Sequence, residues 1–238
     1  MRLSVIIPFL NEEANVDEVL RQVQAVCPDA EILAVDDGST DGTLARLTAA
    51  SGVTVVALAR TSGQSAALHA GLIRARGEVC VMLDGDGQND PADIPSLLDA
   101  LHRADAACGY RVARCDGWRR RLGSWLANVI RRAWLKDGVR DTCCSLKALR
   151  REHVRFLVPF DGMHRYIPAM LRNAGLSVTE VPVRHRPRRY GISKYTLAGR
   201  AARGLRDLAG VRWLLARRRH FPAEVLGATE DARRPNDG

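Results

Sequence analysis

Residues 78–91, EVCVMLDGDGQNDP, carry the pattern that decides the fold. The stretch begins with the apolar run at residues 79–83, which has the length and composition of a buried strand. The run ends in two carboxylates, Asp84 and Asp86, with Gly85 between them. Open α/β sheets bind ligands outside the carboxyl ends of their strands, so this stretch predicts a ligand site at a sheet edge.

The paired carboxylates suggest what that ligand is. Two carboxylates this close repel each other unless a positive charge lies between them. A divalent cation, with a diphosphate behind it, would remove the repulsion, and Mg²⁺ and Mn²⁺ prefer oxygen ligands. The alternative is a polar turn without a ligand, because Asp and Gly are common turn residues. These residues alone leave both interpretations open.

The rest of the first half alternates between strand and helix patterns. Strands are expected at residues 3–9, 31–35, 53–59 and 104–110, and helices at residues 11–25, 41–50, 63–76 and 90–101. This alternation is typical of βαβ units and predicts an α/β fold with a largely parallel sheet flanked by helices. Beyond residue 110 the pattern is less regular. We expect a basic helix at 118–134, a strand or loop at 141–149, a helix at 163–173, a strand at 178–183, a basic loop at 184–194 and a long basic helix at 196–219.

Composition and cysteine usage set limits on the class of protein. The chain has 238 residues and is 46% hydrophobic, enough for one sizeable core. No stretch reaches the roughly 18 consecutive apolar residues of a transmembrane helix, and the apolar segment at residues 3–10 is too short for a signal peptide. The six cysteines lack the paired spacing of zinc sites, so we expect reduced thiols in the cytosol.

Charge divides the chain into two unlike halves. Residues 1–110 contain 7 basic and 16 acidic side chains, whereas residues 111–238 contain 29 basic and 11 acidic ones. The resulting net charges are −9 and +18, and the whole chain has +9. The acidic half suits a metal site, and the basic half suits an anionic partner such as a nucleic acid, a phosphate or a membrane surface.

Three common classes fit the sequence poorly. A dinucleotide-dependent oxidoreductase needs the glycine-rich turn G-x-G-x-x-G after its first strand, but the turn here reads PFLNEE. The chain has no Walker glycine-lysine loop either. A nucleic-acid-binding protein would interleave basic with aromatic residues, and only 5% of the residues are aromatic.

Six motifs, in order, resemble the family 2 glycosyltransferases of GT-A fold. They are PFLNEEANV (8–16), VDDGSTDGT (35–43), SGQSAALHAGL (62–72), LDGDGQNDPADIP (83–95), GYR (109–111) and RYGISKY (189–195). More narrowly, they are similar to the polyprenyl- or dolichyl-phosphate mannosyltransferase group. The resemblance covers about residues 2–200. It implies a GT-A domain at residues 1–195, followed by an amphipathic helix at 196–221 and a polar, disordered tail at 222–238.

The resemblance also implies roles for individual residues. The metal set that carries Mg²⁺ or Mn²⁺ on the diphosphate is Asp84, Asp86 and Gln88. The nucleotide sugar is held by Pro8, Leu10, Glu12, Val35, Asp37 and Gly85, and by a basic loop containing Arg188 and Lys194. The acceptor phosphate is held by Arg111, Arg121 and Ser124. The catalytic residues are Asp86 and Asp141, of which Asp141 lies near the reaction centre.

We therefore expect an inverting, metal-dependent glycosyltransferase that moves a sugar from a GDP- or UDP-sugar to a polyprenyl phosphate. A phosphate acceptor is already ionised at neutral pH, so Asp141 is expected to orient groups rather than act as a strong base. Transfer to a sugar hydroxyl is the enzymatic alternative and would need a true base. The expected location is the cytoplasmic face of the membrane, where the helix at 196–219 makes peripheral contact with anionic lipid.

One segment departs from the family pattern. Residues 142–147 read TCCSLK, where relatives more often carry glycines. Cys143 and Ser145 put side chains where the backbone is expected to pass closely, so they bear on the geometry of the acceptor loop.

Overall fold

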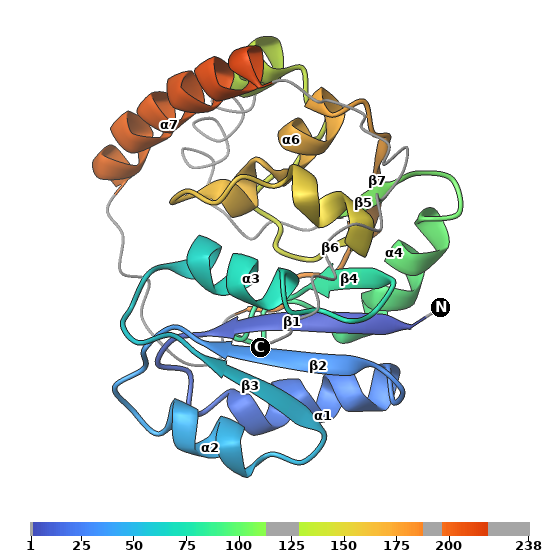
Figure 1. The fold of residues 1–238 in the computed structure, drawn as a ribbon, viewed down its shortest axis with the longest axis vertical. Coiled ribbons are helices and arrows are strands. Elements are labelled where there is room, and N and C mark those ends of the chain that lie inside the picture. Colours follow the sequence, from blue (N-terminus) through green and yellow to red (C-terminus); the bar gives the residue numbers. More distant parts are fainter. Residues whose placement is uncertain (1, 113–128, 188–196, 219–238) are drawn as a thin grey trace, which may run out of the picture.

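The computed structural model describes residues 2–112, 129–187 and 197–218. In this part of the chain one sheet contains seven strands: β1 (Leu3–Phe9), β2 (Glu31–Asp36), β3 (Val53–Ala57), β4 (Val79–Met82), β5 (Ala106–Arg111), β6 (Lys147–Arg150) and β7 (Val178–Val183). Their order across the sheet is β3-β2-β1-β4-β6-β5-β7 (Figure 1). The predicted strands at 3–9 and 178–183 have the expected bounds.

The sheet is mostly parallel, as the alternation of strands and helices predicted. Strands β1, β2, β3 and β4 pair in parallel, and so do β5 and β7. Strand β6 lies between β4 and β5 and is antiparallel to both. The sequence left this segment open between strand and loop. Its four residues, KALR, are short, and only the pairing with both neighbours defines them as a strand.

Helices cover both faces of the sheet (Figure 1). The α-helices are α1 (Val16–Val26), α2 (Thr43–Ala49), α3 (Gln64–Leu72), α4 (Ile94–Ala100), α6 (Ile167–Asn173) and α7 (Leu197–Arg217). Residues 129–135 are also helical. Short 3₁₀ helices lie at η1 (Pro91–Asp93), η2 (Arg151–Phe156) and η3 (Met163–Arg165).

Two apolar clusters separate the layers. One cluster joins the sheet to α1, α2 and α4 and includes Val19, Leu47 and Leu97. The other joins the opposite face to α3, α6 and α7 and includes Leu68 and Met170. Alternate side chains of a strand point to opposite faces, so the same strands supply both cores.

The first helix begins later than the sequence predicted. We expected Asn11 to cap a helix at residue 11, but α1 begins at Val16. Asn11 instead adopts a left-handed conformation with φ 54°. Its Oδ1 accepts a hydrogen bond of 2.8 Å from the backbone N–H of Thr40. A polar side chain that bonds neighbouring backbone competes with helix formation, and here it ties two loops together.

The long basic helix is α7, and its apolar side is largely used by the core. Leu208, Val211 and Leu215 are buried in the cluster that they share with α6 and the sheet. These three residues therefore offer no apolar surface to a membrane. Trp213 is different, because 61% of its surface is exposed. No helix among the described residues has the length and apolar character needed to cross a membrane.

Candidate active site

The carboxyl ends of β1, β2 and β4 meet at one edge of the sheet, as the parallel arrangement requires. Pro8 pairs in register with Val35, and Phe9 pairs with Asp36. At Gly85, just beyond β4, a Cβ atom would lie 2.5 Å from the Phe9 ring and 2.7 Å from the Pro8 carbonyl oxygen. Only glycine fits such a close approach. The structure thus brings Pro8, Val35 and Gly85, three of the predicted donor residues, to this edge.

Backbone amides hold the two carboxylates that follow β2. The buried side chain of Asp37 accepts hydrogen bonds from Ser62 N (2.7 Å) and Gly63 N (2.8 Å), one on each oxygen. Asp36 uses one oxygen, Oδ2, to accept from the N–H groups of Gly38 and Ser39, both at 3.1 Å. Asp36 therefore shapes the turn, and Asp37 fixes the loop that precedes α3.

The remaining predicted donor residues, Leu10 and Glu12, lie in the loop after β1. The backbone N–H of Glu12 donates to Thr43 Oγ1 at 2.9 Å, and its carboxylate accepts from the side-chain amide of Asn15. Leu10 is half-buried. These contacts join the β1–α1 loop to the start of α2, so this edge of the sheet is held from two sides. We call it the donor edge, because the predicted donor residues lie there.

Asp84 lies in an unusual environment for a carboxylate. Burial, and after it the neighbouring charge of Asp86, raises its pKa to about 6. Three groups act in the opposite direction: the hydroxyl of Ser145, the charge of Lys147 and the amide of Gln64. Gln64 Nε2 donates to Asp84 Oδ1 at 2.6 Å. A cation beside Asp84 and Asp86 would offset the free-energy cost of holding a negative charge in a buried place next to a second carboxylate.

The side-chain oxygens of Asp84, Asp86 and Gln88 are of the kind that a hard divalent cation binds together with a diphosphate. Asp86 Oδ1 accepts from Gln88 N at 3.1 Å, so the segment from 84 to 88 turns back on itself. The Gln88 side-chain nitrogen faces His185 Nε2 at 3.4 Å, which assigns any ligand role to the amide oxygen. Within the described ranges, no three His, Cys, Asp or Glu side chains form a metal-holding group. Mg²⁺ is often bound by one or two carboxylates plus substrate phosphates, and this set matches that pattern.

The basic segment at residues 184–187, after β7, is bonded to residues 84–93. We call residues 84–93 the metal segment, because they contain the predicted metal ligands. Arg186 N donates to the carbonyl oxygen of Gln88 at 2.9 Å, and the Arg186 guanidinium pairs with Asp90 at 2.8 Å. Arg184 pairs with Asp93 at 3.0 Å. The sequence pattern predicted residues 184–187 only as part of a basic loop. The acidic residues Asp90 and Asp93, seven residues or fewer past the D-G-D motif, were the available signal.

Arg188 and Lys194, which we predicted to close over the diphosphate, lie outside the described residues. Arg121 and Ser124, two of the predicted acceptor residues, also lie outside them.

The third predicted acceptor residue, Arg111, is paired with the predicted catalytic residue Asp141. Arg111 Nε lies 2.7 Å from Asp141 Oδ2, and its NH2 lies 3.0 Å from Oδ1, so the pair is bidentate. The two side chains are 16% and 9% exposed. Burial alone would lower the pKa of Arg111, but Asp141 raises it. The two residues were expected to have separate roles, and the structure shows that they form one unit.

The segment that departs from the family pattern contacts the metal segment. Ser145 Oγ donates to Asn89 Oδ1 at 2.8 Å, and that same oxygen accepts from Asp84 N at 3.3 Å. Lys147 is buried, and its Nζ donates to the carbonyl oxygens of Thr142 and Cys144. A side chain at position 145 is therefore accommodated and hydrogen-bonded, and Lys147 holds the loop that carries it.

Behind Gln64 lies a polar contact that the sequence did not reveal. His164 Nδ1 lies 2.8 Å from Ser65 Oγ. Burial lowers the pKa of His164 to about 3, and the charges of Arg165 and Lys147 act in the same direction. The ring is therefore neutral, and its Nδ1 accepts a hydrogen bond from the Ser65 hydroxyl. This contact supports the start of α3, from which Gln64 reaches Asp84.

Comparison with known proteins identifies relatives with related chemistry. The chain is 36% identical to dodecaprenyl-phosphate galacturonate synthase from Rhizobium johnstonii, with 93% of this chain and 70% of that protein covered. It is 35% identical to undecaprenyl-phosphate 4-deoxy-4-formamido-L-arabinose transferase from Sodalis glossinidius, with 82% and 63% covered. The chain thus spans less than two thirds of the second relative's length.

A solved structure shares the fold. Glucosyl-3-phosphoglycerate synthase from Mycobacterium tuberculosis, in complex with Mn²⁺, UDP-glucose and phosphoglyceric acid, superposes with a TM-score of 0.72 at 23% identity. The superposition covers 90% of this chain and 80% of that one. Residues 4–157 match the family described as glycosyl transferase family 2. That match covers more than half of the sequence, and together with the relatives it shows that this chain belongs to glycosyl transferase family 2.

Proposed function

We propose that this protein transfers a sugar from a nucleotide-sugar donor to a polyprenyl phosphate. The single observation that carries the proposal is the pair Asp84 and Asp86 at the end of β4, between the donor edge and a basic segment. The two relatives named above act, by their names, on dodecaprenyl and undecaprenyl phosphate. Their chemistry is the closest guide to the acceptor of this chain.

The donor's nucleoside would lie along Pro8, Leu10, Glu12, Val35 and Asp37, and its diphosphate beside Gly85. Asp84, Asp86 and Gln88 would hold Mg²⁺ or Mn²⁺. When bound, the cation supplies Lewis-acid stabilisation of the leaving nucleotide diphosphate. Asp84 is half-buried beside a second carboxylate, and its raised pKa favours a doubly charged partner at this point. Arg188 and Lys194 would add positive charge over the same diphosphate.

The acceptor phosphate would bind at Arg111, with Arg121 and Ser124. Its oxygen is already negative at neutral pH and would attack the anomeric carbon in line, with inversion. Asp141 would then orient Arg111, because both its carboxylate oxygens already accept hydrogen bonds from that guanidinium. This arrangement argues against the rival function, transfer to a sugar hydroxyl, since an ion-paired carboxylate is a weak general base.

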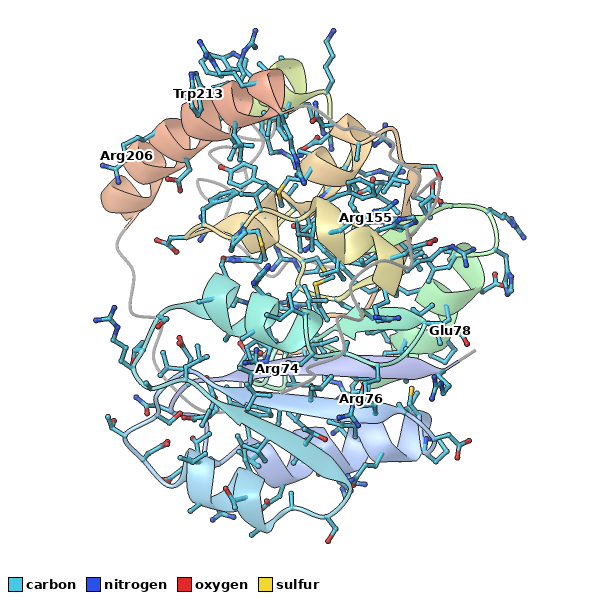
Figure 2. All side chains as sticks on the ribbon, in the orientation of Figure 1. Arg74, Arg76, Glu78, Arg155, Arg206 and Trp213 are labelled. Carbon is cyan, nitrogen blue, oxygen red and sulfur yellow. The ribbon has the colours of Figure 1, made fainter. Side chains whose placement is uncertain are left out.

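A peripheral contact with membrane would bring the acceptor to the site. Trp134 and Trp213 are 45% and 61% exposed. Arg212 lies over the Trp134 ring at 5.4 Å, and Arg217 lies over the Trp213 ring at 5.4 Å. Exposed tryptophans next to arginines are typical of surfaces at the level of lipid headgroups. Figure 2 shows Trp213 and Arg206 on α7, at the periphery of the molecule.

The test is a transfer assay with purified protein, Mn²⁺, a panel of GDP- and UDP-sugars and undecaprenyl phosphate in mixed micelles. We expect a chloroform-soluble sugar product with one donor and no product when EDTA is added. A thermal-shift screen can select the donor beforehand, because a ligand at about 100 times its Kd stabilises a protein by about 2.7 kcal/mol. Transfer to a free sugar hydroxyl, with none to the polyprenyl phosphate, would replace this proposal with its rival.

Membrane contact has its own test, which is co-sedimentation with vesicles. The full chain should bind vesicles that contain anionic lipid, and less so as salt increases. A Trp213→Ser, Arg217→Ser variant should bind more weakly, whereas Arg103→Ser, on the far acidic half, should bind as the natural chain does. Equal binding by both variants would place the membrane contact elsewhere.

A further inference from the structure

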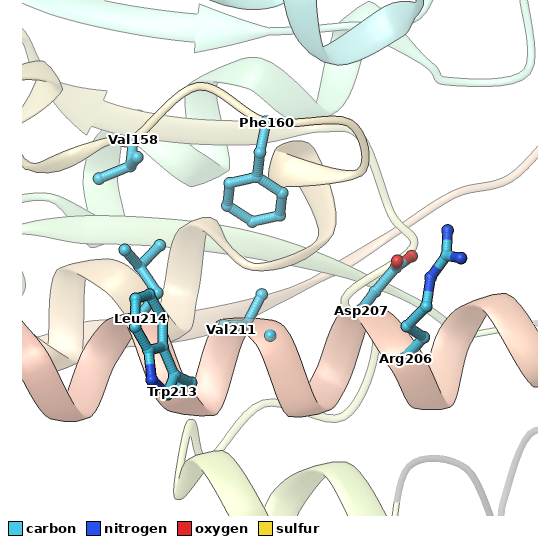
Figure 3. Close-up of a pocket in the computed structure, with 8 residues that line it drawn as sticks. Val158, Phe160, Arg206, Asp207, Val211, Trp213 and Leu214 are labelled. Carbon is cyan, nitrogen blue, oxygen red and sulfur yellow. The ribbon is translucent and has the colours of Figure 1, made fainter.

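An apolar groove lies between α7 and the segment that precedes η3. Its volume is about 390 Å³. Figure 3 shows Val158 and Phe160 on one side and Val211 and Leu214 on the other. Gly210 and Trp213 complete its apolar part. The groove is not part of the donor edge, and of its residues only Trp213 and Arg206 have a place in the roles above, on the surface proposed to face the membrane.

The groove has a polar end. Arg206 and Asp207 lie side by side there, away from Val158 and Trp213 (Figure 3). Asp207 is next to the backbone of Gly162, since a Cβ atom on that glycine would lie 3.7 Å from Asp207 Oδ2. The remaining lining is hydrocarbon, so the groove suits a molecule with an apolar chain and one polar end.

The polar end is connected to the donor edge through a short series of contacts. Gly162 N donates to Ser65 Oγ at 3.1 Å, in the first turn of α3. Asp161, the residue before it, lies beside Gly63, because a Cβ atom on Gly63 would be 3.9 Å from Asp161 Oδ1. Gly63 in turn donates its N–H to Asp37. One segment, residues 160–164, therefore forms both the wall of the groove and a support of the donor site.

We infer that this groove holds isoprene units of the acceptor's hydrocarbon chain. The inference rests on the proposed function, which supplies an acceptor with an anionic head and a long apolar tail. Taking about 30 Å³ for each heavy atom, as in liquid water, a five-carbon isoprene unit needs about 150 Å³. The groove then holds about two to three units, and the rest of the chain continues into the membrane beside Trp213.

Gly210 offers a way to fill the groove without disturbing the core. It is exposed, and apart from the backbone of its own helix no atom of the described residues lies within 4 Å of a Cβ atom placed on it. Glycine is also unfavourable inside a helix, so a side chain there should not weaken α7. Gly204 is the matched control, because it lies on the same helix, its Cβ would meet no atom of the described residues outside that helix within 4 Å, and it does not line the groove. The two variants are Gly210→Phe and Gly204→Phe.

The experiment measures binding and transfer with two soluble acceptors, farnesyl phosphate and ethyl phosphate. Binding is followed by the fluorescence of the tryptophans, of which Trp213 lines the groove. In Gly210→Phe the Kd and KM for farnesyl phosphate should increase at least about tenfold, which is the discrimination that one methylene group in an apolar pocket provides. Both constants for ethyl phosphate should stay unchanged, and Gly204→Phe should match the natural chain with both acceptors.

The outcomes separate the groove from the proposed function. If Gly210→Phe binds and uses farnesyl phosphate as well as the natural chain does, the inference is wrong while the function stands. If the natural chain transfers sugar to no prenyl phosphate, yet Gly210→Phe still weakens farnesyl phosphate binding, the function is wrong and the groove remains a prenyl site. Equal weakening of farnesyl and ethyl phosphate would also overturn the inference, because the effect would then lie at the phosphate.

Discussion

The donor edge and the acceptor side of this molecule hold their charges in different ways. By the acceptor side we mean Arg111, Asp141 and the segments that carry them. At the donor edge, Asp36 and Asp37 accept hydrogen bonds from backbone N–H groups of neighbouring loops. On the acceptor side, Arg111 is held by Asp141. A similar pair joins Arg131, in the helical segment at 129–135, to Asp137 in the loop after it.

This difference has a functional consequence. Backbone amides are fixed by the fold, so the donor edge keeps its shape with or without substrate. An ion pair between two side chains can be exchanged, because a phosphate offers an arginine the same bidentate geometry as a carboxylate. The donor edge is thus prepared for its ligand, whereas Arg111 stays paired with Asp141 and would have to share its guanidinium with an acceptor phosphate.

The largest test of the comparison removes charge from the prepared side. Asp86→Asn should lower kcat by about a thousandfold or more, since Lewis-acid stabilisation of the leaving group contributes several kcal/mol. The variant should unfold in urea as the natural chain does. Asp99→Asn, a change of the same kind on the exposed surface of α4, should keep full activity. Near-normal activity of Asp86→Asn at saturating Mn²⁺ would remove Asp86 from the metal set.

The next test changes the exchangeable side. Arg111→Lys keeps the charge and loses the bidentate geometry. We expect the KM for the acceptor to increase about tenfold to a hundredfold, because a charged hydrogen bond contributes about 1.5–3 kcal/mol. The Kd of the donor, measured by calorimetry, should not change. Arg140→Lys is the control, since Arg140 lies over the Tyr110 ring and pairs with Glu180. An equal loss of donor affinity in Arg111→Lys would place Arg111 in the diphosphate site.

The same contrast explains what could be read from the sequence. The donor edge follows from local patterns: strands 3–9 and 79–83 end in polar motifs, and a parallel sheet must bring those ends together. The acceptor side depends on contacts between distant segments. The Arg111–Asp141 pair spans 30 residues, and the contact of Arg186 with Gln22 spans 164. No local pattern encodes such pairings.

The hardest side chains to predict were those whose type and spacing fit two different structural roles. The apolar residues of α7 have the spacing of an amphipathic helix, and that spacing does not tell a membrane from the protein's own core. Leu208 and Val211 pack inward, while Trp213 is exposed. Asn11 is a good helix cap by type, yet its side chain is used by the loop at Thr40. In both cases the tertiary partner decided the outcome.

A smaller effect tests whether backbone amides fix the donor edge. Asp37 uses both oxygens as acceptors, whereas Asp36 uses only Oδ2. Asp37→Asn must break one hydrogen bond and should lower the free energy of unfolding by about 1–3 kcal/mol. Asp36→Asn can keep both of its bonds and should change the stability less. Urea unfolding of the two variants checks this order, and a larger loss in Asp36→Asn would contradict the described hydrogen bonds.

The smallest expected effect concerns the pH dependence of stability at His164, which supports α3 behind Gln64. Its pKa is about 3 in the folded protein and about 6.5 in an unfolded chain. As the pH falls below 6.5, the unfolded state binds a proton that the folded state refuses, so the stability that depends on neutral His164 is lost. Between pH 6.5 and 5.5 this loss should be about 1 kcal/mol, close to the limit for one proton.

His164→Gln keeps an acceptor for the Ser65 hydroxyl and cannot titrate, so its stability should fall less over this range than that of the natural chain. His102→Gln, at an exposed position, should follow the natural chain. Urea unfolding at the two pH values measures all three proteins, and identical pH dependence in the natural chain and His164→Gln would show that His164 is protonated in the folded state as readily as in the unfolded one.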